Sequence, residues 1–231
     1  MNIVRNDKLI KRNGRIGQWT SLAGLAVLAG GMYISFQKPE LFSYSLAALL
    51  LGFILTQVSM YFGNRFGRSP RPDEKLDAGL KGLPGEFVIF HYSTPVPHLM
   101  IGPAGVWILL PFHQKGQIVY GKNRWKMSGG GLLQNYLRIF GQEGLGRPDL
   151  DAEHHIAVLS KFLEKHADGN LLPEIQVVMV FTNSEVELDP GESPVLALKI
   201  KQLKEFLRSK AREKKLGALE LDRLNEVFQN K

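Results

Sequence analysis

The sequence contains no cysteine, which excludes a disulfide framework and agrees with a reducing compartment. It also lacks charge over two long stretches, because residues 18–36 and 41–62 include no Asp, Glu, Lys or Arg. A membrane-spanning helix needs about 20 apolar residues to cross roughly 30 Å of hydrocarbon. Both stretches are about that long, so the missing charges predict two transmembrane helices.

Several motifs that carry chemistry are missing as well. The chain has no Walker A loop, no Rossmann glycine pattern, no zinc-finger spacing and no Ser-His-Asp arrangement, and the "SGGGLL" at 128–133 lacks the Lys-Ser/Thr of a phosphate loop. No acidic residue lies between Glu86 and Glu143. A carboxylate that binds a metal ion in that stretch would therefore have to come from elsewhere in the fold.

The two apolar stretches are separated by only four residues, 37–40, and Pro39 breaks helicity at this turn. We therefore predict a tight transmembrane hairpin over residues 18–62. Basic residues flank its outer ends, in the N-terminal segment 1–17 and in 63–75, whereas Lys38 is the only one between the spans. The positive-inside rule then predicts a protein of the cell membrane with both termini in the cytoplasm. A cleaved signal peptide is the alternative for the first stretch, but no small-x-small site ends it.

The net charge of +7 has two interpretations. Basic residues beside a membrane bind anionic lipid head groups, whereas a basic domain can also bind nucleic acid. Small residues at four-residue spacing, Ala26 with Gly30 and Ala48 with Gly52, suit close packing of the two helices and would also allow oligomers through them. The alternative is that small residues are simply common in membrane helices.

Residues 63–73 form a polar linker with Gly and Pro, and residues 74–231 form the cytoplasmic domain. Its pattern predicts a helix at 74–83, strands at 87–93, 98–101 and 105–112, and a strand or hairpin at 116–127. A glycine-rich segment, 128–149, contains an amphipathic stretch that either rests on the bilayer or packs on the core. A helix at 152–166 with Asp151 as its N-cap, strands at 175–182 and 195–198, and two amphipathic helices follow. This order predicts an α/β fold with a mixed sheet and flanking helices.

Four features of the domain resemble one known family. They are "HLMIGPAGVWIL" at 98–109, the Lys-Gly pair at 115–116, Trp125, and "VVMVFTN" at 177–183. In this order they are similar to the nuclease-related domain (NERD) over about 73–210. The family belongs to the restriction-endonuclease-like group with the PD-(D/E)XK motif, and membrane-anchored bacterial proteins often carry it. The resemblance implies a restriction-endonuclease-like fold and, in active members, metal-assisted hydrolysis of phosphodiesters.

The resemblance also implies where the active residues would lie. In active members an Asp opens one strand, and a Glu and a Lys two residues apart lie near the end of the next, so that the acids hold Mg²⁺ and the Lys orients water. The corresponding positions here are Pro97, Leu110 and Phe112. None of these side chains can ligate a hard cation. Val106 and Ile108 extend Leu110 and Phe112 into one apolar face, which we expect other parts of the protein to cover.

The polar candidates that remain are few. Glu74 matches the acid that the family carries in its early helix. His98 and His113 would need a distant carboxylate to form a rearranged metal site, and the alternative interpretation is that both are polar loop residues at strand ends. The other histidines, His91 and the adjacent His154 and His155, receive the same structural interpretation.

Four cations gather near the hairpin predicted at 116–127: Lys115, Lys122, Arg124 and Lys126. Tyr120 and Trp125 are interleaved with them. Cations that contact phosphate and aromatic rings that stack on bases are typical of a nucleic-acid surface. The alternative is a solvated face above aromatic residues of the core.

The pattern as a whole predicts a membrane-anchored NERD-like protein without catalytic residues or a cofactor. Besides the lipid bilayer, its partner would be nucleic acid or a cytoplasmic protein, which it would bind as a scaffold. One alternative is a metal-dependent nuclease that uses Mg²⁺ in a rearranged site. The other is a structural membrane protein that interacts with lipid through residues 128–149.

Overall fold

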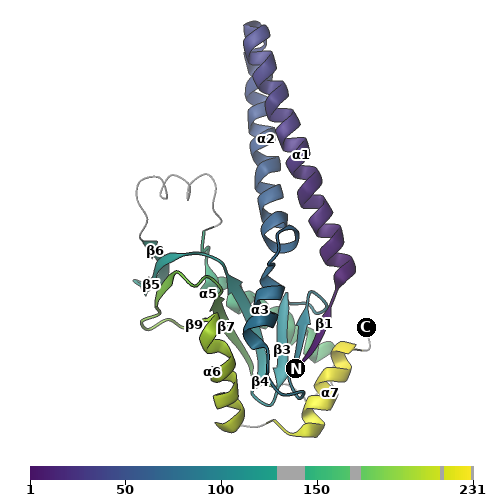
Figure 1. Ribbon diagram of the computed structural model, residues 1–231, viewed down its shortest axis with the longest axis vertical. Helices are drawn as coiled ribbons and strands as arrows, with labels where there is room; N and C mark the ends of the chain where they lie inside the picture. Colours follow the sequence, from purple (N-terminus) through teal and green to yellow (C-terminus); the bar gives the residue numbers. More distant parts are fainter. Residues whose placement is uncertain (129–143, 167–172, 214–215, 230–231) are drawn as a thin grey trace. The chain divides into compact units, whose positions relative to one another are not determined.

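The computed structural model describes residues 1–128, 144–166, 173–213 and 216–229 (Figure 1). The chain forms two compact units. One is a helical unit, Asp7–Arg71, and the other is a globular unit made of Met1–Asn6 together with Pro72–Lys231. The helical unit is therefore an insertion in the sequence of the globular unit, which departs from the predicted division into an N-terminal segment, a hairpin, a linker and a domain.

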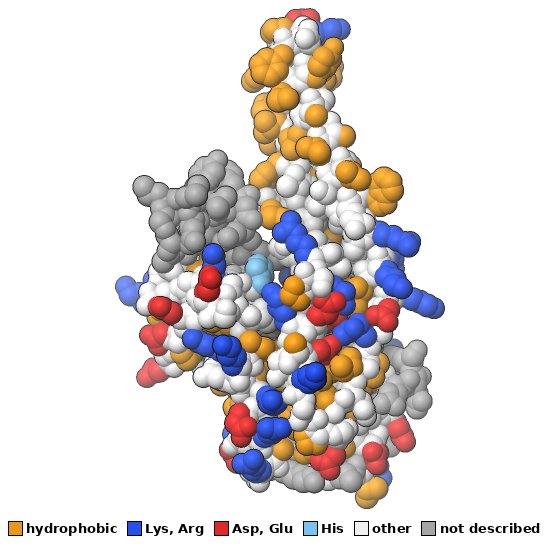
Figure 2. All heavy atoms as spheres, in the orientation of Figure 1, with side chains coloured by type: hydrophobic (Ala, Val, Ile, Leu, Met, Phe, Trp, Pro, Cys, Tyr) orange, Lys and Arg blue, Asp and Glu red, His pale blue; other side chains and the backbone are white. Residues whose placement is uncertain are grey.

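The helical unit contains the two apolar stretches. It consists of α1 (Asp7–Gln37), the short η1 (Pro39–Leu41), α2 (Phe42–Phe62) and a π-helical turn, η2 (Gly63–Gly67). Two helices of this unit are long and apolar enough to cross a membrane, and hydrophobic side chains cover much of their exposed surface (Figure 2). Helix α1 begins at Asp7, so most of the predicted basic segment 1–17 is helical.

Glycines bring α1 and α2 into close contact. A Cβ atom at Gly52 of α2 would lie 2.5 Å from the side chain of Leu28, and one at Gly31 of α1 would lie 2.8 Å from the Cβ atom of Ala48. A larger residue at either position would therefore push the helices apart. The expected packing role of Ala48 and Gly52 is confirmed.

The expected role of Ala26 and Gly30 in this contact is wrong. Ala26 is exposed, and a Cβ atom at Gly30 would meet nothing within 4 Å. Three of the four buried glycines of α1 are instead spaced seven residues apart: Gly17, Gly24 and Gly31, with Gly14 one turn before the first of them. A seven-residue spacing keeps one stripe facing its neighbour along two gently supercoiled helices.

The globular unit is built on a six-stranded mixed sheet in the order β1–β2–β3–β4–β7–β9 (Figure 1). Its strands are β1 (Asn2–Arg5), β2 (Val88–His91), β3 (His98–Gly102), β4 (Gly105–Phe112), β7 (Ile175–Phe181) and β9 (Leu196–Lys199). Strands β2, β3 and β4 are antiparallel neighbours, β1 is parallel to β2, and β7 is parallel to both β4 and β9. The predicted mixed sheet is confirmed, but β1 lies in a segment for which the sequence predicts no strand.

Helices cover both faces of this sheet. Helices α3 (Pro72–Leu80) and α6 (Ile200–Glu213) share one hydrophobic cluster with it, and α5 (Pro148–His166) and α7 (Ala218–Gln229) share the other. Strand β7 contributes Val178 to the first cluster and Met179 to the second, as expected of a central strand. Helix α5 starts at Pro148, so Asp151 lies in its first turn and is not the N-cap that the sequence predicts.

A second, three-stranded sheet has the order β6–β5–β8. It consists of β5 (Gly116–Gly121), β6 (Arg124–Ser128) and β8 (Val186–Asp189). The predicted hairpin is confirmed, and both residues of its turn, Lys122 and Asn123, have positive φ angles, as a type I′ turn requires. The sequence indicates a polar loop where the structure has β8, so this expectation is wrong. The strand has only four residues, and two of them, Glu187 and Asp189, are acids. The amphipathic stretch predicted in 128–149 lies largely outside the described residues.

His155 of α5 gives the globular unit a pH-dependent stability. Its pKa is lowered, first by burial and then by the neighbouring His154, against the opposing charge of Asp151. Because the folded chain binds this proton more weakly than the unfolded chain, the contribution to stability is complete above about pH 6.5 and is lost as the pH falls below it. We expect His155→Gln to reduce the fall in Tm of the full-length protein between about pH 7.5 and about pH 5, measured by tryptophan fluorescence. His154→Gln should leave most of the fall in place, and equal slopes for wild type and His155→Gln would contradict the prediction.

Candidate functional site under helix α3

A row of polar residues crosses three neighbouring strands of the main sheet. Arg5 of β1 is in register with His91 of β2, and His91 is in register with His98 of β3. Alternate residues of a strand share a face, so His91 lies on the same face as Ile89, and His98 on the same face as Met100. Both apolar residues belong to the cluster formed with α3 and α6. The polar row therefore lies on the side of the sheet that α3 covers.

Helix α3 adds two acids to this row. Asp73 and Asp77 are one turn apart. Leu76 lies between them in the sequence and Leu80 follows them, and both leucines belong to the hydrophobic cluster. The spacing 73, 76, 77 and 80 is that of the buried face of a helix. This spacing is a sequence signal that could have found both acids. The family resemblance points to the neighbouring Glu74 instead.

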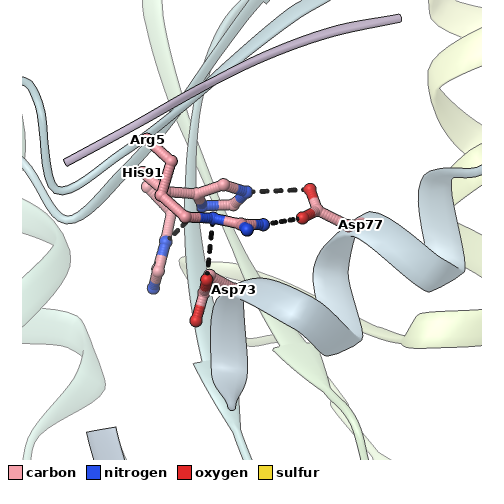
Figure 3. A network of polar contacts seen from close by, with 5 residues as sticks. Arg5, Asp73, Asp77 and His91 are labelled. Carbon is pink, nitrogen blue, oxygen red and sulfur yellow. Dashed lines mark hydrogen bonds and ion pairs between the residues drawn. The ribbon is translucent and has the colours of Figure 1, made fainter. Parts of the chain in front are cut away.

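Arg5 bridges the two acids (Figure 3). Its Nε atom lies 3.0 Å from Oδ2 of Asp73, an ion pair without the alignment of a hydrogen bond, and its Nη2 atom donates to Oδ2 of Asp77. The other oxygen of Asp77, Oδ1, lies 3.0 Å from Nε2 of His91. Asp73 is fully buried, and the side chains of Arg5 and Asp77 are 26% and 16% exposed. A cation thus fills the space between two carboxylates that would otherwise repel each other.

The two histidines contact each other through their ring nitrogens. Their Nδ1 atoms are 2.8 Å apart, and both residues are buried. Because the carboxylate of Asp77 can only accept, Nε2 of His91 carries a hydrogen. Only one hydrogen fits between the two Nδ1 atoms, so one ring donates and the other accepts.

The loop between β2 and β3 holds the histidines side by side. Tyr92 has a φ angle of 55°, in the left-handed region that costs a residue with a side chain roughly 1 kcal/mol or more. Its amide donates to the carbonyl of Pro97 at 2.8 Å, which closes the loop, and its ring packs edge-on against His98 at 4.8 Å between centroids. The backbone at Tyr92 is thus strained where the chain turns from one histidine to the other.

The positions that would carry the active site of a nuclease lie on the opposite face of the sheet. Leu110 is 8% exposed and belongs to the cluster under α5 and α7, together with Val106 and Ile108. The ring of Phe112 stacks on Phe181 at 5.4 Å. The prediction that protein covers this apolar face is confirmed. Because His98 projects from the other face, it cannot combine with these positions in one site.

The structure also separates the other predicted site residues. His98 opens β3 and is 2% exposed, so its interpretation as a polar loop residue is wrong. His113 is exposed and follows β4. In the sheet, Leu99 next to His98 is paired with Ile108 of β4. His113 lies five residues beyond Ile108, which is roughly 16 Å along the strand. Pro97 precedes β3, and Glu74 lies on α3. The predicted pairing of His98 with His113 is therefore not formed.

The hairpin β5–β6 carries its predicted cations at the surface but not its aromatic residues. Arg124 and Lys126 are exposed, whereas Trp125 between them is 7% exposed and packs towards Phe181 at 6.4 Å between ring centroids. Tyr120 packs edge-on against Trp125. Trp125 is therefore a core residue and is not placed to stack on a base.

Acids accompany these cations. Lys126, Val119 and Asp189 are in register across β6, β5 and β8, so a cation and an acid lie at opposite edges of one exposed row. Lys115 forms an exposed ion pair with Glu185 at 3.7 Å, and Lys122 lies in the turn. The outer face of the small sheet therefore has mixed charge. A continuous basic surface would be expected of a nucleic-acid interface.

Metal chemistry has little support in the polar row. Among the residues that the structure describes, no group of three His, Asp or Glu side chains could hold a metal ion. The ring nitrogens and carboxylate oxygens under α3 instead bind one another and Arg5. Comparison with known proteins adds no assignment, because no family model, curated protein or solved structure matches the chain.

Proposed function

We propose that this chain is a membrane-anchored protein with a NERD-like α/β unit that acts as a non-catalytic binding or scaffold module at the cytoplasmic face of the membrane. The observation that carries this proposal is that Leu110 is buried in the hydrophobic cluster under α5 and α7 and that the partly buried Phe112 packs against it. In an active member of the resembled group, a Glu and a Lys would occupy these positions. Leucine and phenylalanine can neither ligate Mg²⁺ nor activate water.

The order of elements supports the resemblance. Helix α3 is followed by three antiparallel strands, β2 to β4, then by α5, and then by β7, which is parallel to β4. This is the helix, strands, helix and strand order that the sequence predicts for the domain. The elements in this order make up most of the main sheet and include α5, the helix between the parallel strands β4 and β7.

The pairing of β1 with β2 supports the proposed topology. These strands lie on either side of the helical unit in the sequence, yet Arg5 and His91 are in register in one sheet. If α1 and α2 both cross the membrane, the chain returns to the side from which it left. The basic residues on both flanks then favour the cytoplasmic side.

The charge pattern favours a protein partner over nucleic acid. The aromatic residue expected to stack on bases, Trp125, is buried, and acids share the outer face of β6–β5–β8 with Arg124 and Lys126. A surface of alternating charge suits a partner with complementary charges of both signs. Nucleic acid bound through Lys115, Lys122, Arg124 and Lys126 remains the ligand that the family resemblance implies.

The proposal is tested with the full-length protein in nanodiscs, incubated with labelled single- and double-stranded DNA and RNA and with Mg²⁺ or Mn²⁺. We expect no cleavage above that of empty nanodiscs. Metal-dependent cleavage that is lost in Glu74→Gln, His98→Gln or His113→Gln would overturn the proposal. Binding is followed in the same samples by fluorescence anisotropy, and tight binding that weakens steeply with salt would assign nucleic acid as the ligand.

A second candidate function, a nuclease with a rearranged site, is favoured by one observation. Acidic side chains do converge near His98, because Asp77 contacts His91 and His91 contacts His98. Arg5 opposes this reading, since it already occupies the space between Asp73 and Asp77. Cleavage that is abolished by Asp77→Asn would identify this cluster as the catalytic centre.

A further inference from the structure

A row of cations lies along one face of α1, in the helical unit and apart from the site under α3. Its members are Lys8, Lys11, Arg12 and Arg15. Their spacing of three, four and seven residues places them on adjacent turns of the same face. Together with Ile16, Trp19 and Thr20 they line an open cavity of about 570 Å³. Lys and Arg side chains are seen to gather at this end of the helices (Figure 2).

Asp7, in the first turn of α1, is the acid nearest to this row in the sequence. None of its four cations forms an ion pair with a described residue, and no acid lines the cavity. The opposite face of α1 is the one that packs within the helical unit, where Ile10, Gly14 and Gly17 are buried. The cations therefore project away from α2, and their charge is open to an external anion.

The row is followed directly by an apolar, membrane-length stretch. Trp19 is 70% exposed and ends the row, and residues 18–36 carry no charge. Tryptophan concentrates at the level of the lipid head groups, which occupy about 5–8 Å on each side of the hydrocarbon. At 1.5 Å per residue, Arg15 and Arg12 lie about 6 and 10 Å from Trp19 along the helix axis. Their side chains are long enough to bend back to phosphate depth.

We infer that this face of α1 is a binding site for the head group of an anionic phospholipid. Guanidinium groups match phosphate oxygens in a two-pronged geometry, and Lys8 and Lys11 add charge on the neighbouring turns. Ile16 and Trp19 give the acyl chains of the same lipid an apolar contact. The inference deepens the proposed membrane anchoring and does not depend on the absence of catalysis.

The test is native mass spectrometry of the full-length protein in detergent, titrated with phosphatidylglycerol or with phosphatidylcholine. We expect phosphatidylglycerol to bind more tightly than the neutral lipid. The double variant Arg12→Gln, Arg15→Gln should weaken phosphatidylglycerol binding about 25-fold, at about 5-fold for each cation. The variant Arg12→Lys, Arg15→Lys should lose less affinity than the Gln double variant, since it keeps the charge but not the two-pronged geometry.

The matched control is Lys38→Gln, Arg68→Gln, which removes the same number of charges from the helical unit but outside the row. It should leave phosphatidylglycerol binding within about 2-fold of wild type. An equal loss in the two double variants would show an effect of net charge alone and would overturn the site. So would equal affinity for the two lipids, or displacement of phosphatidylglycerol by a short oligonucleotide at lower concentration than by inorganic phosphate.

Extraction of cell membranes with alkaline carbonate tests the anchoring separately. If only the lipid site is wrong, the protein stays in the membrane pellet, whereas a protein that is not anchored is released.

Discussion

Replacing Arg5 with alanine should lower the free energy of unfolding of the globular unit by about 2–4 kcal/mol. The variant removes the guanidinium that bridges Asp73 and Asp77, so two carboxylates under one helix lose the cation between them. Breaking a fully buried pair costs about 3–5 kcal/mol, and the expected value is lower because Arg5 is 26% exposed. The measurement is urea unfolding of the full-length protein in detergent, followed by the fluorescence of the buried Trp107 and Trp125.

An exposed ion pair in the same unit provides the control. Lys115→Ala removes the contact with Glu185, whose side chain is 70% exposed, and should cost less than about 1 kcal/mol. Asp77→Ala combined with Arg5→Ala should cost less than the sum of the two single variants, because the residues share one contact. If Arg5→Ala were as mild as Lys115→Ala, the bridge would contribute little to stability and the prediction would be wrong.

Rebuilding the nuclease pattern should unfold the globular unit. The double variant Leu110→Glu, Phe112→Lys restores the Glu-x-Lys spacing but places two charges among apolar residues under α5 and α7. The loss of a buried Leu side chain alone costs about 2–5 kcal/mol, and an uncompensated buried charge adds several more. The sum approaches the roughly 5–15 kcal/mol that stabilise a typical domain. We expect loss of the cooperative unfolding transition and no cleavage of DNA or RNA in the presence of Mg²⁺.

Two milder variants separate polarity from shape. Leu110→Met and Phe112→Leu keep the apolar character of both positions and should cost less than roughly 1.5–2 kcal/mol each. They should also leave the lipid affinity of the α1 cation row unchanged. A folded Leu110→Glu, Phe112→Lys protein that binds Mg²⁺ would show that this part of the sheet is open to water and would contradict the predicted unfolding.

The apolar strands could be predicted from the sequence because their side chains report burial directly. The predicted strand at 105–112 is β4, and Val106, Ile108 and Leu110 lie in one hydrophobic cluster as their alternation indicates. Strand β8 could not be predicted in the same way, since its four residues include two exposed acids. Strand β1 has no signal of its own, because it pairs with residues that follow the whole helical unit in the sequence.

The site under α3 was only partly accessible to sequence reasoning. The spacing of Asp73 and Asp77 with Leu76 and Leu80 marks a buried acidic face, but nothing near them in the sequence indicates that Arg5 is their partner. His91 lies in an apolar strand, and its bond to His98 follows from the register of β2 with β3. Register depends on pairing over the whole strand, which a local pattern does not fix.

The split of the globular unit by α1 and α2 sets the order of events during translation. Residue 1 and its hydrogen-bond partner Leu83 are 82 positions apart, so at roughly 5–20 residues per second residue 1 is synthesised about 4–16 s before that partner. Both apolar helices are synthesised in that interval. The nascent N-terminal strand must therefore wait for them before it can join β2. An mRNA that began at codon 72 would encode a sheet with β2 at its edge and no arginine for Asp73 and Asp77.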